Sequence, residues 1–235
     1  MRKIFTKCTE CRTASCLIKQ NSNAVWIKQL EEHNQMAFYK EGQHIVYENN
    51  PVMGLYFIQE GKAKIYSTGI NNKMQVVRLA KAGGIIGHRG YGGDLYPVGA
   101  IAIEDSTVCF IDNETMYNAF MENPKLTFNL MMYYSKELRN SEARIKNIAQ
   151  MNVKEKVADA LLYVDDVFNP TGNTHKIISL TRKDLSDLAG INPEQLSRIL
   201  SELKMEKLIT IVSSEINIVD IDKLKSIVSP FNRTY

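Results

Sequence analysis

The stretch that most constrains the fold is residues 180–208, where two short amphipathic helices are predicted to meet at a tight turn. Thr181 is a good N-cap for the first helix. Gly190 predicts the end of that helix, because glycine adopts the left-handed backbone conformation at little cost. Asn192 and Pro193 then supply the N-cap and the first position of the second helix. Because these signals agree, the sequence predicts a helix-turn-helix.

The second helix of such a motif lies in the major groove of DNA and presents its N-terminal side chains to the bases. Arginine can bind guanine through two hydrogen bonds, glutamate can accept from cytosine, and serine or glutamine can bond either way. We expect the DNA-binding residues to be Thr181, Arg182, Lys183, Glu194, Gln195, Ser197 and Arg198. The alternative interpretation is a helical hairpin packed inside an enzyme.

The composition is that of an ordinary soluble protein, and 235 residues suffice for one large domain or two small ones. No apolar run approaches the ~20 residues of a membrane span, and the N-terminus has no apolar signal-peptide region. We therefore expect a cytoplasmic protein without a membrane partner. A net charge of +3 argues against a non-specific nucleic-acid binder, yet it suits a sequence-specific one with a few well-placed basic residues.

Short apolar or alternating runs fill residues 39–112 and are separated by glycine, asparagine and proline turns. This spacing predicts an all-β sandwich or barrel, whose interior could hold a small ligand. Residues 24–38 are predicted as a helix, with Trp26 in the core.

Residues 87–99 form a glycine-dense loop in which freed backbone N–H groups could bind an anion. Gly87, His88 and Arg89 are the candidate effector residues of this loop. The alternative is a glycine-rich turn without a ligand.

Residues 124–151 are predicted as one long helix. Its apolar positions alternate spacings of three and four, which is typical of a coiled-coil seam, and charged residues flank them. We interpret it as a dimerisation helix, the alternative being a helix that only packs on the β domain. The predicted interface residues are Met131, Tyr134, Leu138, Ser141, Ile145 and Ile148.

The remaining chain, residues 152–235, is predicted as a second domain. A helix at 153–168 and a turn at 169–173 precede the helix-turn-helix, and Asn152 is the expected hinge. Strands at 208–211 and 215–219 then form a hairpin, followed by a last helix. A hairpin after two helices is a winged arrangement, and wings often contact the phosphate backbone.

Cys8, Cys11 and Cys16 lie within nine residues in a C-x2-C-x4-C pattern. In a cytosolic chain such thiols indicate metal or cluster ligands before disulfides, and soft thiolates suit zinc or iron–sulfur. A closed site needs a fourth ligand, for which Cys109 is the other cysteine. The alternative is a set of unligated thiols.

We find no catalytic motif, and the four histidines are scattered, so we predict that the protein is not an enzyme.

The order of cysteine cluster, β-roll, long seam helix and winged helix-turn-helix resembles the Crp/Fnr family of bacterial transcription regulators. The most specific likeness is E-x-x-S-R at Glu194, Ser197 and Arg198, which is similar to the reading residues of the Fnr branch. The resemblance implies an α+β fold with three parts. These are a cyclic-nucleotide-binding-like jelly roll with the cysteine segment at 1–123, a dimerisation helix at 124–151 and a winged helix-turn-helix domain at 152–235.

The resemblance also implies a homodimeric transcription regulator that binds a palindromic operator in double-stranded DNA and contacts RNA polymerase. We expect an activator, the alternative being a repressor. Arg198 would read guanine, Glu194 cytosine and Ser197 thymine. A ligand-binding β-roll that acts through protein partners rather than DNA is the alternative function.

Two features bear on the signal. Family members that bind cyclic nucleotides carry a G-E-L arm and a following arginine, but here His88 replaces the acidic residue and residues 97–99 lack the arginine. A buried cyclic phosphate would lack its counter-charge, so we argue against cAMP. The cysteines resemble the oxygen-sensing branch, although the last gap is one residue shorter. That likeness implies a [4Fe–4S] cluster on Cys8, Cys11, Cys16 and Cys109. A small effector in the β-roll, or no effector, stays open.

Overall fold

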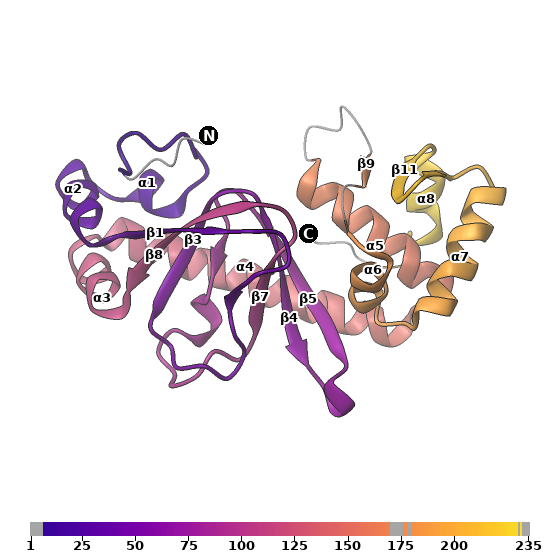
Figure 1. Ribbon diagram of the computed structural model, residues 1–235, viewed down its shortest axis with the longest axis horizontal. Coiled ribbons are helices and arrows are strands. Elements are labelled where there is room, and N and C mark those ends of the chain that lie inside the picture. The colour runs from indigo at the N-terminus through magenta and orange to yellow at the C-terminus, as the bar shows by residue number, and fades with distance from the viewer. Residues whose placement is uncertain (1–6, 170–175, 178–179, 230, 232–235) are drawn as a thin grey trace. The chain divides into compact units, whose positions relative to one another are not determined.

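The computed structural model describes residues 7–169, 176–177, 180–229 and 231 (Figure 1). The chain divides into two compact units. The first comprises Met1–Lys73 with Val77–Ser135, and the second Met74–Val76 with Lys136–Tyr235. Helix α4 (Pro124–Gln150) begins in the first unit and ends in the second. Within the described ranges, no helix is long and apolar enough to cross a membrane.

The first unit contains two four-stranded sheets, which confirms the predicted β-roll. In order, the first sheet consists of β1 (Gln35–Tyr39), β8 (Ser106–Asp112), β3 (Gly54–Glu60) and β6 (Ile85–Ile86). Strand β8 pairs antiparallel with both β1 and β3. The second sheet consists of β2 (His44–Val46), β7 (Gly99–Ala102), β4 (Lys62–Thr68) and β5 (Met74–Lys81).

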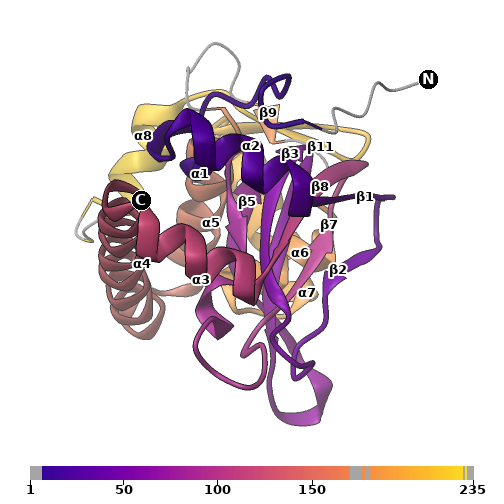
Figure 2. The same ribbon diagram turned by 90° about the vertical axis from the view of Figure 1, so that its left-hand side faces the viewer.

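Apolar side chains of the first sheet enter two separate cores, because successive strand residues point to opposite faces. One face packs with the second sheet, and its core includes Ile58, Ile65, Ile86, Ala100 and Val108. The other face is covered by helices (Figure 2). These are α1 (Leu17–Asn21), α2 (Ala24–His33), α3 (Asn113–Glu122) and the first turns of α4. Trp26 is buried in this second core, as predicted.

The helix predicted for residues 24–38 is wrong beyond His33. Helix α2 ends there, and Gln35–Tyr39 forms the edge strand β1, in which Ala37 lies opposite Val108. The apolar pattern of residues 35–39 is compatible with a helix or a strand. These residues form a strand because they pair with β8, and the tendency of a segment to form a strand depends on its cross-strand neighbours.

The second unit confirms the predicted winged helix-turn-helix arrangement. Its elements are α5 (Val153–Phe168), β9 (Lys176–Ile177), α6 (Arg182–Ala189), α7 (Pro193–Met205), β10 (Ile209–Val212), β11 (Glu215–Ile218) and α8 (Ile221–Ile227). Asn152 caps α5 in a reciprocal capping box with Glu155. Strands β10, β11 and β9 form a three-stranded sheet in that order. The turn predicted at 169–173 falls mostly outside the described residues.

The glycine-dense loop packs on α4 within the first unit. Gly87 has φ +83°, and His88–Gly90 forms one 3-10 turn in which the Gly90 N–H donates to the Gly87 carbonyl. The His88 side chain is only 2% exposed, and its ring meets those of Tyr133 and Tyr134 edge-on. The Tyr134 hydroxyl donates to the His88 carbonyl. In this loop the Gly90 N–H is therefore hydrogen-bonded within the loop itself, and the His88 side chain is packed against α4.

We predict that His88 makes the protein less stable in mild acid. Burial, reinforced by the charges of Arg78 and Arg89, lowers the pKa of His88 from 6.5 to about 2. Below pH 6.5 the unfolded chain therefore binds a proton that the folded chain does not, so stability is lost as pH falls. Between about pH 7.5 and pH 5.5 this loss is about 1 kcal/mol.

Urea unfolding over this pH range measures the effect. His88→Gln should flatten the pH dependence of the unfolding free energy, whereas His33→Gln, at an exposed histidine, should not. Equal pH dependence in wild type and His88→Gln would contradict the prediction.

Candidate nucleic-acid interface and cysteine pocket

Local side-chain caps build the turn between α6 and α7. The Thr181 side-chain oxygen accepts from the Asp184 N–H at 3.0 Å, which fixes the start of α6. Gly190 ends α6 with φ +70°, where a side chain would be strained. Asn192 then caps α7 in a reciprocal capping box with Gln195. The predicted start, stop and restart signals are thus confirmed.

Helix α7 has one buried and one exposed side. Leu196, Ile199, Leu200 and Leu203 are buried within the second unit. Glu194, Ser197 and Arg198 lie on the exposed side. Three of the side chains predicted to read bases are therefore accessible together near the N-terminal end of one helix.

Other predicted DNA-binding residues are half-buried or bonded within the protein. Gln195 is half-buried, and its Oε1 accepts from the Asn192 N–H at 3.4 Å. The exposed Lys183 ammonium lies 2.7 Å from Asp187 Oδ2. Arg182 is half-buried, and burial lowers its pKa. Gln195 thus helps to form the turn, in addition to its predicted role in DNA binding.

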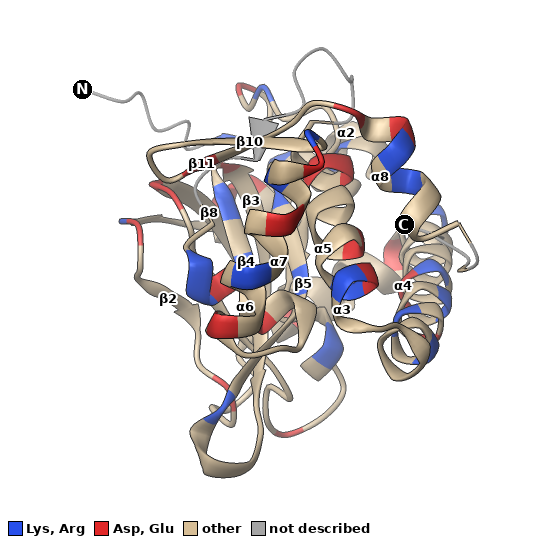
Figure 3. Ribbon diagram, turned by 90° about the vertical axis from the view of Figure 1, so that its right-hand side faces the viewer, with Lys and Arg blue, Asp and Glu red and all other residues tan. Residues whose placement is uncertain are grey.

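Charge on this unit is mixed. Lysine and arginine segments on α6 and α7 alternate with acidic ones (Figure 3). Lys154 of α5 lies 2.8 Å from Glu202 and 2.6 Å from Glu206, so it joins α5 to the later turns of α7. This charge pattern favours specific contacts by a few residues over a broad basic face.

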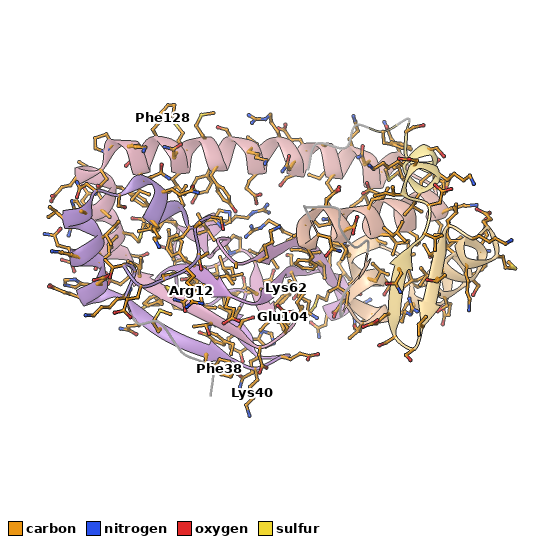
Figure 4. The ribbon with its side chains drawn as sticks, turned by 90° about the horizontal axis from the view of Figure 1, so that it is seen from above. Arg12, Phe38, Lys40, Lys62, Glu104 and Phe128 are labelled. Carbon is orange, nitrogen blue, oxygen red and sulfur yellow. The ribbon has the colours of Figure 1, made fainter. Side chains whose placement is uncertain are left out.

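Helix α4 carries exposed apolar side chains at heptad spacing. Met131, Leu138 and Ile145 are 54%, 61% and 71% exposed. Phe128, 56% exposed, extends the row and points away from the β-roll (Figure 4). An exposed apolar row of this kind commonly marks an interaction surface. Phe128 lies one turn before Met131, where the predicted seam begins, and so it was not among the predicted interface residues.

The other predicted seam residues are half-buried in their own chain. Tyr134 is half-buried, and its hydroxyl donates to the His88 carbonyl. Ile148 is half-buried and lines a pocket with Tyr163 of the same unit. Ser141 Oγ donates to the Glu137 carbonyl one turn earlier, at 2.8 Å. The predicted seam thus combines residues from two adjacent stripes of α4, and the exposed stripe is the one that contains Leu138.

All four cysteines line one pocket in the first unit. Its volume is about 340 Å³, including the part open to solvent. Cys109 lies on β8, opposite Met36 of β1 and Phe57 of β3. None of the four thiols is in a disulfide. The remaining lining residues are Lys7, Lys19, Asn34, Met36 and Gln59.

Side-chain hydrogen bonds hold the N-terminal segment over this pocket. Thr13 Oγ1 donates to the Gln59 carbonyl at 2.7 Å, and Ser15 Oγ donates to the Ala82 carbonyl at 3.3 Å. Ser15 approaches Gly83 so closely that a Cβ at that glycine would collide with it. Three cysteines that are distant from Cys109 in sequence are thereby brought to the same pocket.

Burial controls the protonation of these thiols. It raises the pKa of Cys8 to about 11 and that of Cys109 to about 12, and it also raises the pKa of Cys16. Burial also acts to raise the pKa of Cys11, but hydrogen bonds from Thr13 and Gln59 outweigh burial, so the pKa of Cys11 is lowered. The cysteines also raise one another's pKa, as expected for thiols that share a pocket.

The four cysteines form a donor set of the kind that iron–sulfur clusters use. Among the described residues, no three His, Cys, Asp or Glu side chains converge closely enough to hold one metal ion. The four thiols instead surround a shared space. Four soft thiolates are the ligands of iron–sulfur clusters, whose several iron atoms each take a separate sulfur.

Two family models match the chain. Residues 36–123 match the cyclic nucleotide-binding domain, and residues 155–227 match the Crp-like helix-turn-helix domain. The fumarate and nitrate reduction regulatory protein of Vibrio cholerae is 24% identical over 91% of this chain and 86% of its own length. The transcriptional activator protein Anr of Pseudomonas protegens is 22% identical over 91% of this chain and 88% of its own.

Solved structures share the fold. The structure of FixK2 from Bradyrhizobium japonicum superposes with a TM-score of 0.74 at 21% identity and covers 83% of this chain and 96% of its own. Together with the cyclic nucleotide-binding and helix-turn-helix domains, this architecture identifies the chain as a member of the Crp/Fnr family of DNA-binding transcription regulators.

Proposed function

We propose that this regulator is a homodimeric transcription activator whose DNA affinity is controlled by a [4Fe–4S] cluster on its four cysteines. The observation that carries the proposal is that Cys8, Cys11, Cys16 and Cys109 line one pocket. The relatives from Vibrio cholerae and Pseudomonas protegens are named as a fumarate and nitrate reduction regulator and as a transcriptional activator, which agrees with a redox-responsive activator. An activator of this type acts by contacting RNA polymerase at the promoter.

DNA reading is assigned to the exposed side of α7. Arg198 reads guanine through two hydrogen bonds, Glu194 accepts from cytosine, and Ser197 contacts thymine. All three side chains are exposed, while the opposite side of α7 is buried. Thr181, Arg182 and Lys183 at the start of α6 are assigned to the phosphate backbone.

We predict that Arg198→Ala weakens binding to the specific site by roughly 1–3 kcal/mol and relaxes base preference at one position. The physical reason is the loss of a bidentate contact with guanine. The measurement is a titration of a fluorescent duplex that wild-type protein has selected from a random pool.

Arg139→Ala serves as the matched control, because it removes the same charge from an exposed position on α4. It should leave base preference unchanged. If Arg198→Ala binds the selected duplex as tightly as Arg139→Ala does, the assignment of α7 as the reading helix is wrong.

Dimerisation is assigned to the exposed row Phe128, Met131, Leu138 and Ile145 of α4. Because these side chains share one helical stripe, two copies of α4 can bury them against each other as a coiled coil. A dimer with two-fold symmetry presents two reading helices to the two halves of a palindrome.

We predict that Leu138→Glu yields monomers. The substitution places a charge in the proposed interface, where it would be buried without a partner. Loss of the second half-site should weaken operator binding by roughly 10²-fold. Sedimentation velocity measures the oligomeric state, and Lys136→Glu, at an exposed position of the same helix, is the control. A Leu138→Glu protein that sediments as the wild-type dimer would place the interface elsewhere.

Cluster binding can affect α4 because both contact the same hydrophobic core. Cys16 and Cys109 pack against the core that also buries Leu126 and Leu130 of α4, and Tyr134 packs against the same core. Loss of the cluster therefore changes the packing beneath the first turns of the proposed dimerisation helix. When bound, such a cluster supplies an oxygen-labile redox centre.

We predict that Cys109→Ser, purified without oxygen, loses most of its iron and sulfide, because a serine oxygen is a harder donor than a thiolate. Iron and sulfide assays with a visible spectrum measure this loss. Thr107→Ser, on the same strand, removes one methyl group and should keep the cluster. Full iron content in Cys109→Ser would remove that residue from the ligand set.

A further inference from the structure

Lys19 occupies a distinctive position at the cysteine pocket. It lies in α1, three residues after Cys16, and its half-buried side chain lines the pocket. Its ammonium group donates to the backbone carbonyl of Cys11. One side chain thus connects the helix that begins after the third cysteine to the backbone of the second.

The segment between these two cysteines is fixed from both sides. Thr13 and Ser15 attach it to the β-roll through the Gln59 and Ala82 carbonyls, at 2.7 and 3.3 Å. The Lys19 contact attaches the beginning of the same segment to α1. With these three contacts in place, the backbone that carries Cys11 and Cys16 has little freedom to move relative to the pocket.

The charge of Lys19 acts on the pocket as well. Its side chain lines the same pocket as Cys11 and Cys16, and its ammonium contacts the Cys11 backbone, so its positive charge lies beside these thiols. Four thiolates carry more negative charge than the iron–sulfide core of a cluster carries positive charge, so a bound cluster is an anion. The potential of such a cluster depends on nearby charge and on hydrogen bonding around its ligands.

We propose that Lys19 is a positioning residue for the cluster, holding the Cys11–Cys16 segment in place and setting the cluster's sensitivity to oxygen through its positive charge. This inference rests on the proposed cluster function. A neighbouring cation favours the reduced, more negative form, so Lys19 makes oxidation harder. An ordinary surface lysine that only stabilises α1 would alter stability without altering the cluster's potential.

The test uses full-length protein purified without oxygen. Lys19→Met should hold less iron than wild type, bleach severalfold faster in air-saturated buffer and have a more negative midpoint potential. Lys19→Arg, which keeps the charge and a donor, should restore wild-type values. Lys28→Met removes an exposed lysine of α2 that does not line the pocket, and it should behave as wild type.

Lys19→Gln keeps an amide donor for the Cys11 carbonyl but removes the charge, so it tests the charge even if Lys19→Met folds poorly. Its predicted result is retained iron with faster bleaching and a more negative potential. Wild-type potential and bleaching rate in Lys19→Gln would overturn the inference. A wild-type protein without iron and sulfide would instead overturn the cluster proposal itself, and this inference with it.

Discussion

The first unit depends on the alternation of side chains along β8. This strand lies between β1 and β3, so its backbone is hydrogen-bonded on both sides. Val108 therefore points into the core between the sheets, while Cys109 points to the opposite face, against the helical core. A register shift of one residue would exchange the two and move the thiol into the sandwich, away from the other three cysteines.

The same helical core links the cysteine segment to α4. Leu126 and Leu130 are buried there, and Tyr134 anchors the next turn to the loop that holds His88. The opposite stripe of the helix, which includes Phe128 and Leu138, stays exposed. The helix thus has one stripe that its own domain requires and another that is available to a partner. A change of packing at the cysteine pocket can therefore shift α4 and alter the proposed dimer interface on its exposed side.

How much of the structure follows from sequence depends on how local the determining interactions are. Caps such as Thr181, Asn152 and Asn192 act within three residues, so α5, α6 and α7 could be predicted closely. Strand β1 could not be predicted, because its pairing with β8 joins segments about 70 residues apart.

Similarly, heptad spacing alone does not distinguish Tyr134, which binds the His88 loop, from Leu138, which is exposed. Cysteine spacing suggested a shared site, whereas the contact between Lys19 and Cys11 appears only when α1 folds back over the segment before it.

Whether a cluster on the four cysteines controls DNA affinity can be tested on one anaerobic preparation. DNA affinity and the visible spectrum are measured together on it, before and after air is admitted. We predict that iron–sulfur absorption bleaches and that affinity for the selected duplex falls in step with it. A colourless, iron-free anaerobic protein, or an affinity unchanged after bleaching, would contradict the account.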